Sequence, residues 1–308
     1  MASQIMQKKN KRHGRSVFFK QRVMGYAFIA PAIIMFAVFT VVPFILGFWY
    51  SFTDFNLYAA YNLVGFGNYR SAFMNAQFGR SFLNVIVYAI IVIPLSIITS
   101  FFAAVMVNTK IRGAKVYRVM FYIPAVTSGI AVAFIFNWIY RGNEEGVLNT
   151  IIGAVGIGPI EWLNSFNYRV MFSLAAMAAW ISLGGNMLIW LAALKGVSPE
   201  LYEASSVDGA NAWQKIWYVT LPSIAPTLYF IVTMSVIGAF QLLDPVVLMV
   251  PQTLALNYAR TPMYEIFING FTGFMTGGYA AAMSIVLFVV IMAFTFVTQR
   301  FFKEDRTA

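Results

Sequence analysis

Three carboxylates lie close together in one polar segment of an otherwise apolar chain. Glu200, Glu203 and Asp208 fall within residues 198–222, whose sequence is SPELYEASSVDGANAWQKIWYVTLP, and long apolar runs flank this segment on both sides. Exposed carboxylates on a short helix can form charge-assisted contacts with basic groups of another protein. The alternative is a solvated amphipathic loop that only joins two membrane helices.

The same segment carries start and stop signals for two short helices. Ser198 is a good N-cap and Pro199 suits a first turn, whereas Gly209 interrupts the pattern and allows a sharp turn. Asn211, followed three residues later by Gln214, resembles a capping box. The segment therefore predicts a helix, a turn and a second helix, with Glu203 and Asp208 facing outward.

A second group of polar and aromatic side chains lies in or beside the apolar runs. Amides, carboxylates and hydroxyls can hydrogen-bond to the hydroxyls of a sugar, and an aromatic face can cover its C–H surface. The same side chains can instead join neighbouring helices or sit at the membrane interface, and both possibilities stay open. The candidates for the substrate path are Asp244, Gln241, Asn186, Ser182, Trp180, Asn137 and Trp138.

Motifs for other chemistry are absent from the sequence. No Gly-Lys pair exists, so the chain has no phosphate-binding loop of the G-x-x-x-x-G-K-[ST] type. No His-Glu-x-x-His motif occurs, the chain has no cysteine, and its one histidine, His13, lies in a basic tail. The sequence thus predicts neither an enzyme nor a metal site.

Six uncharged runs are long enough to cross a bilayer as helices, which takes about 20 apolar residues each. Only 10% of the chain is charged and 60% is hydrophobic, which is typical of an all-α integral membrane protein. The first run is too long for a cleaved signal peptide, so we expect it to be retained. The runs are 23–53, 81–109, 119–140, 170–194, 216–243 and 266–299.

The basic residues predict the orientation of these six helices. Sixteen of the 21 lysines and arginines fall on the side that holds both termini and residues 198–222, and five fall on the other. Positive residues favour the cytoplasmic side. Both termini and the polar segment are therefore expected in the cytoplasm, and the net charge of +10 reflects this asymmetry more than affinity for nucleic acid.

The spacing within the polar segment closely resembles the EAA loop of the permease subunits of ABC importers, EAA-x3-G-x9-I-x-LP. Ser205 replaces the second alanine and Val219 replaces the isoleucine. Further stretches resemble the carbohydrate branch of that family, of the maltose and glycerol-phosphate type. They are APAIIMFAVFTVVPFILGFWYSFTDF (30–55), GFGNYRSAF (65–73), RVMFYIPAV (118–126) and GAFQLLDPVVLM (238–249).

The resemblance implies a type I importer permease fold with six transmembrane helices and a cytoplasmic EAA loop at 198–222. The permease domain would span 23–302, between a basic cytoplasmic tail (1–22) and a short C-terminal tail (303–308). In that family the loop docks into a groove of a separate ATPase, where Glu203 would pair with an arginine. The coupling residues implied are Glu203, Ala204, Ser205, Asp208, Gly209, Leu221 and Pro222.

Several partners follow from the same resemblance. They are two ATPase subunits that bind ATP and magnesium, a second permease that completes a heterodimer, and an extracytoplasmic solute-binding protein that delivers a sugar. The chain itself is expected to need no cofactor and to reside in a bacterial cell membrane as a multi-pass protein.

The resemblance fails at the sugar pocket of the maltose permease. At the positions matched to the asparagines and the tyrosine of that pocket, this chain carries Ala178, Gly185, Ala239 and Leu242. Either the substrate differs, the cavity is less selective, or the contacts lie on the partner permease. A non-sugar solute such as a glycerol phosphate ester is the alternative cargo. A stand-alone secondary transporter and a membrane scaffold are the alternatives of another class, but mid-span ionisable groups and inverted repeats are not visible.

Overall fold

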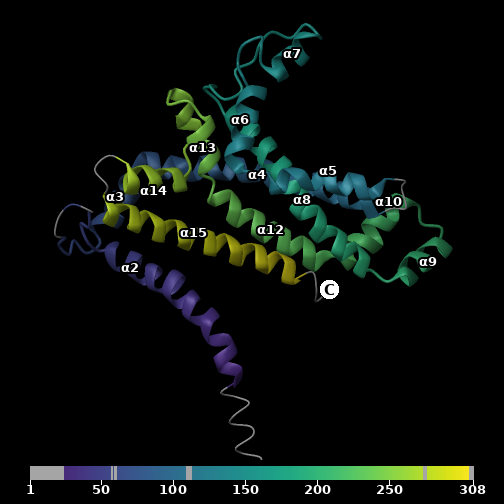
Figure 1. The fold of residues 1–308 in the computed structure, drawn as a ribbon, viewed down its shortest axis with the longest axis horizontal. Helices are drawn as coiled ribbons and strands as arrows, with labels where there is room; N and C mark the ends of the chain where they lie inside the picture. Colours follow the sequence, from purple (N-terminus) through teal and green to yellow (C-terminus); the bar gives the residue numbers. More distant parts are fainter. Residues whose placement is uncertain (1–23, 57, 59–60, 109–112, 273–275, 305–308) are drawn as a thin grey trace, which may run out of the picture.

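The computed structural model describes residues 24–56, 58, 61–108, 113–272 and 276–304 as a predominantly helical protein (Figure 1). The predicted basic tail (1–22) and the last four residues lie outside the described part. An isolated antiparallel bridge pairs Thr53 with Leu63 in the segment after the first long helix.

Four helices are long and apolar enough to cross a membrane by themselves. Two more candidates are bent pairs, in which a break of a few residues separates segments that differ in direction by 99° and 74°. The apolar runs are thus confirmed as helical, but two of them are not straight rods. The four long helices are Met24–Tyr50, Ala76–Asn108, Arg169–Gly196 and Gly277–Arg300, and the bent pairs are Ala114–Val126 with Gly129–Ile139 and Ala212–Ser223 with Ala225–Phe240.

The last predicted run, 266–299, is divided between two helices. α14 (Pro262–Phe271) ends before residues 272–276, and α15 (Gly277–Glu304) begins a new helix that packs against it. Thr261 caps α14 by accepting a hydrogen bond from the backbone N–H of Tyr264. Hydropathy alone cannot detect this break, because both helices are apolar. α15 also continues past residue 302, where the sequence predicts the end of the membrane domain.

The core of the bundle is the pair formed by α4 (Ala76–Asn108) and α8 (Arg169–Gly196), which pack along their length. Trp190 on α8 is fully buried and donates its indole N–H to Ser100 Oγ on α4, over 3.2 Å. α5 (Ala114–Val126) crosses α8 so closely at Gly184 that an added Cβ would lie 2.6 Å from the carbonyl oxygen of Phe121. Small residues permit such close helix contacts in membrane proteins.

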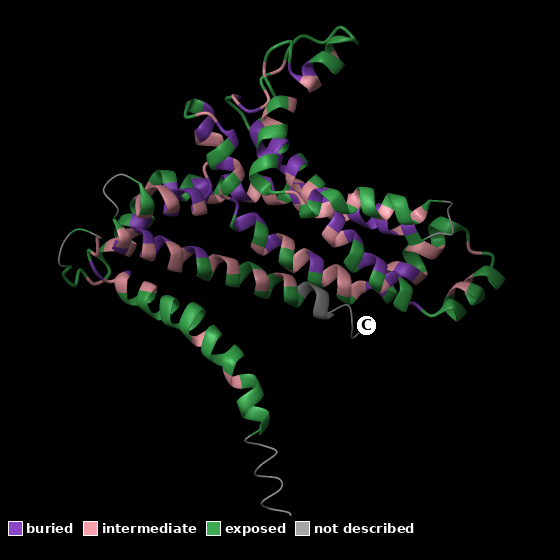
Figure 2. Cartoon of the chain, viewed as in Figure 1, coloured by how far each residue is buried: buried purple, intermediate pink, exposed green. Residues whose placement is uncertain are grey.

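The first long helix leaves the bundle and is largely exposed (Figures 1 and 2). It contains the π-helical turn η1 (Ala37–Val41) and α2 (Val42–Tyr50), and α2 contacts α15, where the rings of Phe44 and Phe288 lie 5.6 Å apart. None of its most apolar window is buried within the chain. Apolar side chains over such a length must be covered by lipid or by another protein.

A smaller outer group of helices projects from the middle of the bundle (Figure 1). α6 (Gly129–Ile139) packs against α13 (Asp244–Met249), and α7 (Val147–Gly153) extends beyond them. The elements not yet described are α3 (Gly67–Met74), α9 (Pro199–Val207), α10 (Ala212–Lys215), η2 (Ile216–Thr220), α11 (Leu221–Ser223), α12 (Ala225–Phe240) and η3 (Leu254–Tyr258).

Candidate functional site

The polar segment forms the two predicted short helices. Ser198 Oγ accepts the backbone N–H of Glu200 over 3.3 Å at the start of α9. The capping box at α10 is present in both directions, since Asn211 Oδ1 accepts the N–H of Gln214 and Gln214 Oε1 accepts the N–H of Asn211. Local side-chain chemistry therefore fixes both helix starts, as the sequence predicts.

The turn between the two helices depends on Gly209. Its φ is +79°, in the left-handed region that glycine adopts without steric cost. The backbone N–H of Ala210 donates to Ser205 O over 2.9 Å, and that of Gly209 donates to Ser206 O over 3.1 Å. These two bonds close the end of α9 as a Schellman motif.

One face of α9 carries the predicted carboxylates and is open to its surroundings. Glu203 and Asp208 are exposed, and so are Leu201, Ala204 and Val207, of which Val207 is 88% exposed. α9 and α10 lie together at the end of the bundle opposite α3 and α14 (Figure 1). The face thus combines acidic groups with small and apolar ones, which suits contact with another protein.

The opposite face of α9 is tied to the membrane helices. The hydroxyl of Tyr202 donates to Thr220 Oγ1 over 3.0 Å, since Thr220 Oγ1 itself donates to the carbonyl of Lys215. Lys215 Nζ donates to Ser206 Oγ over 2.7 Å. α9 and η2 are therefore held together across the turn.

This assembly rests on a buried apolar cluster shared by α4, α8 and α12. Tyr202 and the half-buried Leu221 pack against it, whereas Pro222 is exposed. Proline has no N–H to donate, which accounts for the change from π-helix to a short α-helix at η2 and α11. A displacement of α9 would reach α4, α8 and α12 through this contact. The cluster includes Phe101, Trp190, Leu194, Val197, Ile224 and Ile231.

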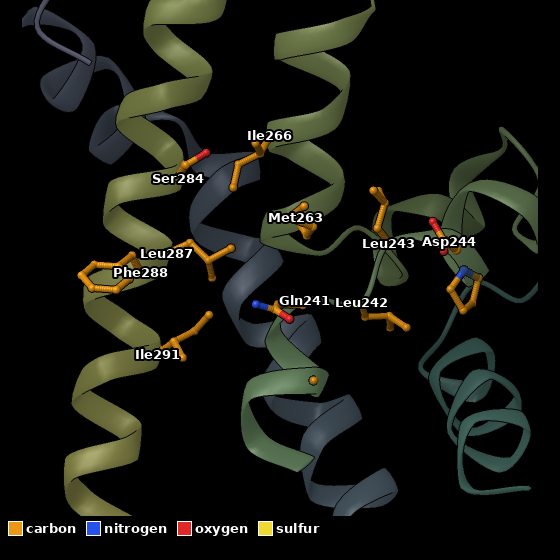
Figure 3. A pocket seen from close by; sticks show the side chains of 12 residues that line it. Gln241, Leu242, Leu243, Asp244, Met263, Ile266, Ser284, Leu287, Phe288 and Ile291 are labelled. Atoms are coloured by element: carbon orange, nitrogen blue, oxygen red, sulfur yellow. The ribbon is translucent and has the colours of Figure 1, made fainter. Parts of the chain in front are cut away.

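A second candidate site is a cavity of about 750 Å³ between the end of α12 and helices α13, α14 and α15, which we name the Asp244 pocket. Gln241 is the residue that follows α12, and Figure 3 shows it between the α15 side chains and Asp244. The lining residues are Gly238, Gln241, Leu242, Leu243, Asp244, Pro245, Met263, Ile266, Ser284, Leu287, Phe288 and Ile291.

Asp244 lies just beyond the end of the fifth apolar run. The run is predicted to end at residue 243, and α12 ends at Phe240. Asp244 instead occupies the first turn of α13, where the helix dipole favours a carboxylate. Its side chain is exposed to the pocket.

The other candidates for the substrate path lie outside this pocket. Asn137 on α6 donates to the carbonyl of Leu248 over 3.2 Å, so it links α6 to α13. Trp138 on the same helix is exposed. On α8, Ser182 donates to Ala179 O in its own helix, Trp180 is 39% exposed, and Asn186 is half-buried. Of the seven candidates, Gln241 and Asp244 are the two that line this pocket.

Sequence reasoning missed the contribution of the last two helices. Met263 and Ile266 come from α14, and Ser284, Leu287 and Phe288 come from α15. The hydroxyl of Ser284, within an apolar run, is the one local sequence signal for the contribution of these helices to the pocket. Of the four positions compared with the maltose permease, Ala239 and Leu242 are buried in the core and Ala178 packs against it. Of the four, Leu242 alone also lines the Asp244 pocket.

Two further polar centres also escaped the sequence patterns. Arg260 and Glu265 form an ion pair of 2.9 Å whose glutamate is 4% exposed. Asn149 is buried and holds the segment around α7 through five hydrogen bonds. Asn149 thereby fixes the backbone around α7, and the ion pair lies at the start of α14.

Comparison with known proteins gives a consistent family. A family model described as "Binding-protein-dependent transport system inner membrane component" matches residues 72–304. The probable ABC transporter permease protein YesP of Bacillus subtilis is 32% identical over 283 residues, which covers 90% of each chain. The arabinooligosaccharides transport system permease protein AraP of the same species is 30% identical over 289 residues, covering 92% of this chain and 90% of the relative.

Other similarities extend this result. The lactose transport system permease protein LacF of Rhizobium radiobacter is 30% identical and covers 88% of this chain. Among solved structures, a chain of a bacterial ABC transporter involved in the import of the acidic polysaccharide alginate has a TM-score of 0.78, with 92% of this chain and 96% of that chain covered. At 23% identity, that match demonstrates a shared fold.

Proposed function

Because this chain belongs to the family of binding-protein-dependent transport system inner membrane components, the permeases of ABC importers, we propose that it forms half of the path for a sugar or oligosaccharide across a bacterial cell membrane. The exposed face of α9 carries this proposal. Glu203 stands on a helix whose start, end and turn are fixed by local hydrogen bonds. Because α9 is held in place and exposes acidic side chains, it can transmit a displacement made by a partner protein to α4, α8 and α12.

The partner that binds α9 is a separate ATPase, which binds ATP and magnesium. An arginine of that subunit pairs with Glu203, and the exposed Ala204 and Val207 supply apolar contact beside it. Truncating one member of such a shielded pair costs about 2–5 kcal/mol. Ser205, Asp208, Gly209, Leu221 and Pro222 give the loop its shape or rest on the cluster below it.

A second permease subunit completes the path. The first long helix supports this step, because its apolar side chains are not covered by this chain. The bundle comprises six spans if each bent pair crosses once, with both termini in the cytoplasm. In this arrangement residues 23–302 form the permease domain between the tails 1–22 and 303–308, and a solute-binding protein docks on the side that carries α3, α7 and α14.

The carbohydrate cargo is supported by the named relatives and by the chemistry of the Asp244 pocket. AraP and LacF are named for arabinooligosaccharides and lactose. Gln241, Asp244 and Ser284 supply an amide, a carboxylate and a hydroxyl, and Phe288 supplies an aromatic face. Sugars bind through this combination of groups.

Reconstituted transport tests the proposal. The chain is purified with its second permease and ATPases, placed in liposomes, and supplied with the solute-binding protein of the same transport system and with labelled oligosaccharides. We expect uptake only when ATP is supplied on the side of the liposome membrane that carries α9. ATP-dependent uptake of a glycerol phosphate ester alone would identify the other cargo class, and uptake that persists without any ATPase would overturn the assignment.

A further inference from the structure

The Asp244 pocket carries a single charge. Of the described residues that line it, none is a lysine or arginine, and Asp244 is the one ionisable side chain. The other polar groups, Gln241 and Ser284, are neutral. Ser284 Oγ donates its proton to Ala280 O within α15, so toward a solute it can act only as an acceptor.

Asp244 is not neutralised by a neighbour. In the described part of the chain its carboxylate has no hydrogen bond and no ion pair, whereas Glu265 and Glu145 pair with Arg260 and Arg141. Arg260 lies just before α14 and Glu265 lies within it, beside Met263 and Ile266 of the adjacent wall, and the two charges of this pair cancel. The lining of the pocket therefore carries a net negative charge.

A fixed carboxylate in a concave, partly apolar site acts more strongly than one on a flat surface, because low-dielectric walls focus its field. Leu287, Phe288 and Ile291 form such a wall on α15 (Figure 3). The charge repels anions and still accepts hydrogen bonds from neutral hydroxyls.

We propose that Asp244 is an electrostatic selectivity residue that admits neutral glycosides to this pocket and excludes anionic ones, such as uronate-containing sugars and phosphate esters. This inference rests on the proposed transport function and narrows its substrate class. Gln241 then provides a donor and an acceptor for sugar hydroxyls, and Phe288 packs against the apolar face of the ring.

Charged thiol reagents test this potential directly, because the chain has no cysteine of its own. Gln241→Cys is introduced with Asp244 intact and with Asp244→Asn. The assembled transporter is treated with cationic trimethylammonioethyl methanethiosulfonate or with anionic sulfonatoethyl methanethiosulfonate, and the modification of this chain is followed by intact mass. Ser71→Cys, at an exposed position of α3, is the matched control outside the pocket.

The ratio of cationic to anionic labelling rates gives the answer. For Gln241→Cys we expect Asp244→Asn to lower this ratio about tenfold, because the substitution removes the one charge that lines the pocket, at a partly screened site. For Ser71→Cys the ratio is expected to stay within about twofold, because Ser71 is exposed outside the pocket, where water and salt screen the charge. An unchanged ratio at position 241, or no labelling there by either reagent, would overturn the proposal. If Gln241→Cys fails to assemble, Ser284→Cys on α15 reports the same potential with a smaller shift.

Sugar uptake separates this result from the transport assignment. Neutral oligosaccharide uptake by the parent complex supports the transport function whatever the labelling ratio shows. A normal shift in labelling with no uptake of any sugar would retain the negative pocket and reject its carbohydrate cargo.

Discussion

The hydroxyl of Tyr202 lies 3.0 Å from Oγ1 of Thr220, and this contact joins the exposed helix α9 to the segment that leads into α12. The two residues are 18 positions apart, and Thr220 is buried. The link therefore connects the face that meets the proposed ATPase with a helix that forms the proposed path.

Removing the Tyr202 hydroxyl should weaken coupling while the fold persists. Tyr202→Phe deletes a hydrogen bond worth about 1 kcal/mol and leaves the ring packed on its apolar cluster. We expect the complex to hydrolyse more ATP for each sugar imported. The ratio of hydrolysis to uptake in liposomes measures this, and Tyr218→Phe, at an 80% exposed position, is the control. Equal ratios for the two variants would show that the link transmits nothing.

Gly209 should resist replacement because of its backbone angle and not because of crowding. No atom lies within 4 Å of the position that a Cβ would take, but φ is +79°. Gly209→Ala should cost about 1–2 kcal/mol, and Gly209→Asn should cost less. Gly196→Ala, also uncrowded but with no positive φ, serves as the control. Thermal unfolding in detergent compares the three, and equal stability of the two alanine variants would refute the strain argument.

Asn149 should prove essential to the segment that carries α7. Its Nδ2 donates to the carbonyls of Arg141, Asn143 and Ile160, and its Oδ1 accepts from Ile160 N and Trp162 Nε1. Asn149→Ala leaves several part-buried groups unsatisfied, at about 1–3 kcal/mol each before relaxation.

Limited proteolysis measures this effect. One unsatisfied group that costs roughly 1.4 kcal/mol raises the population of the locally opened segment tenfold. We therefore expect cleavage between α6 and α8 to become at least about tenfold faster in Asn149→Ala. Asn143→Ala removes an exposed side chain from the same segment and should leave the rate nearly unchanged. Similar protection in the two variants would contradict the proposed role of Asn149.

The ion pairs Arg260–Glu265 and Arg141–Glu145 should differ sharply in their contribution to the free energy of unfolding. Glu265 is 4% exposed and pairs with Arg260 at 2.9 Å, whereas Glu145 is 74% exposed and pairs with Arg141 at 3.2 Å. Glu265→Gln leaves a partly buried arginine without its counter-ion and should cost about 3 kcal/mol. Glu145→Gln should cost less than about 1 kcal/mol. Unfolding of the solubilised complex compares them, and equal effects would show that burial is not the deciding factor.

Local chemistry explains why the polar segment could be predicted from the sequence. The caps at Ser198 and Asn211 and the turn at Gly209 each depend on residues within a few positions of one another. The same holds for the apolar runs, whose length and composition predict helices. These features need no knowledge of the tertiary structure.

The pocket could not be predicted in the same way. Its walls come from α12, α13, α14 and α15, and their meeting depends on the break before Gly277 and on the bend that precedes α12. A hydropathy profile does not reveal the break or the bend, because the residues on each side of them are apolar. Asp244 and Gln241 could therefore be identified as candidates from their residue types, whereas the contribution of Ser284 and Phe288 to the pocket could be seen only in the structure.

Coupling through Glu203 is the central claim, and ATP-driven uptake by the reconstituted complex tests it most directly. Glu203→Ala is compared with Glu200→Ala, which removes an exposed carboxylate from the first turn of the same helix. The account predicts that Glu203→Ala lowers uptake at least about tenfold, since losing one shielded charge pair costs 2 kcal/mol or more, and that Glu200→Ala leaves it near normal. Normal uptake in Glu203→Ala, with the ATPase still bound, would contradict it.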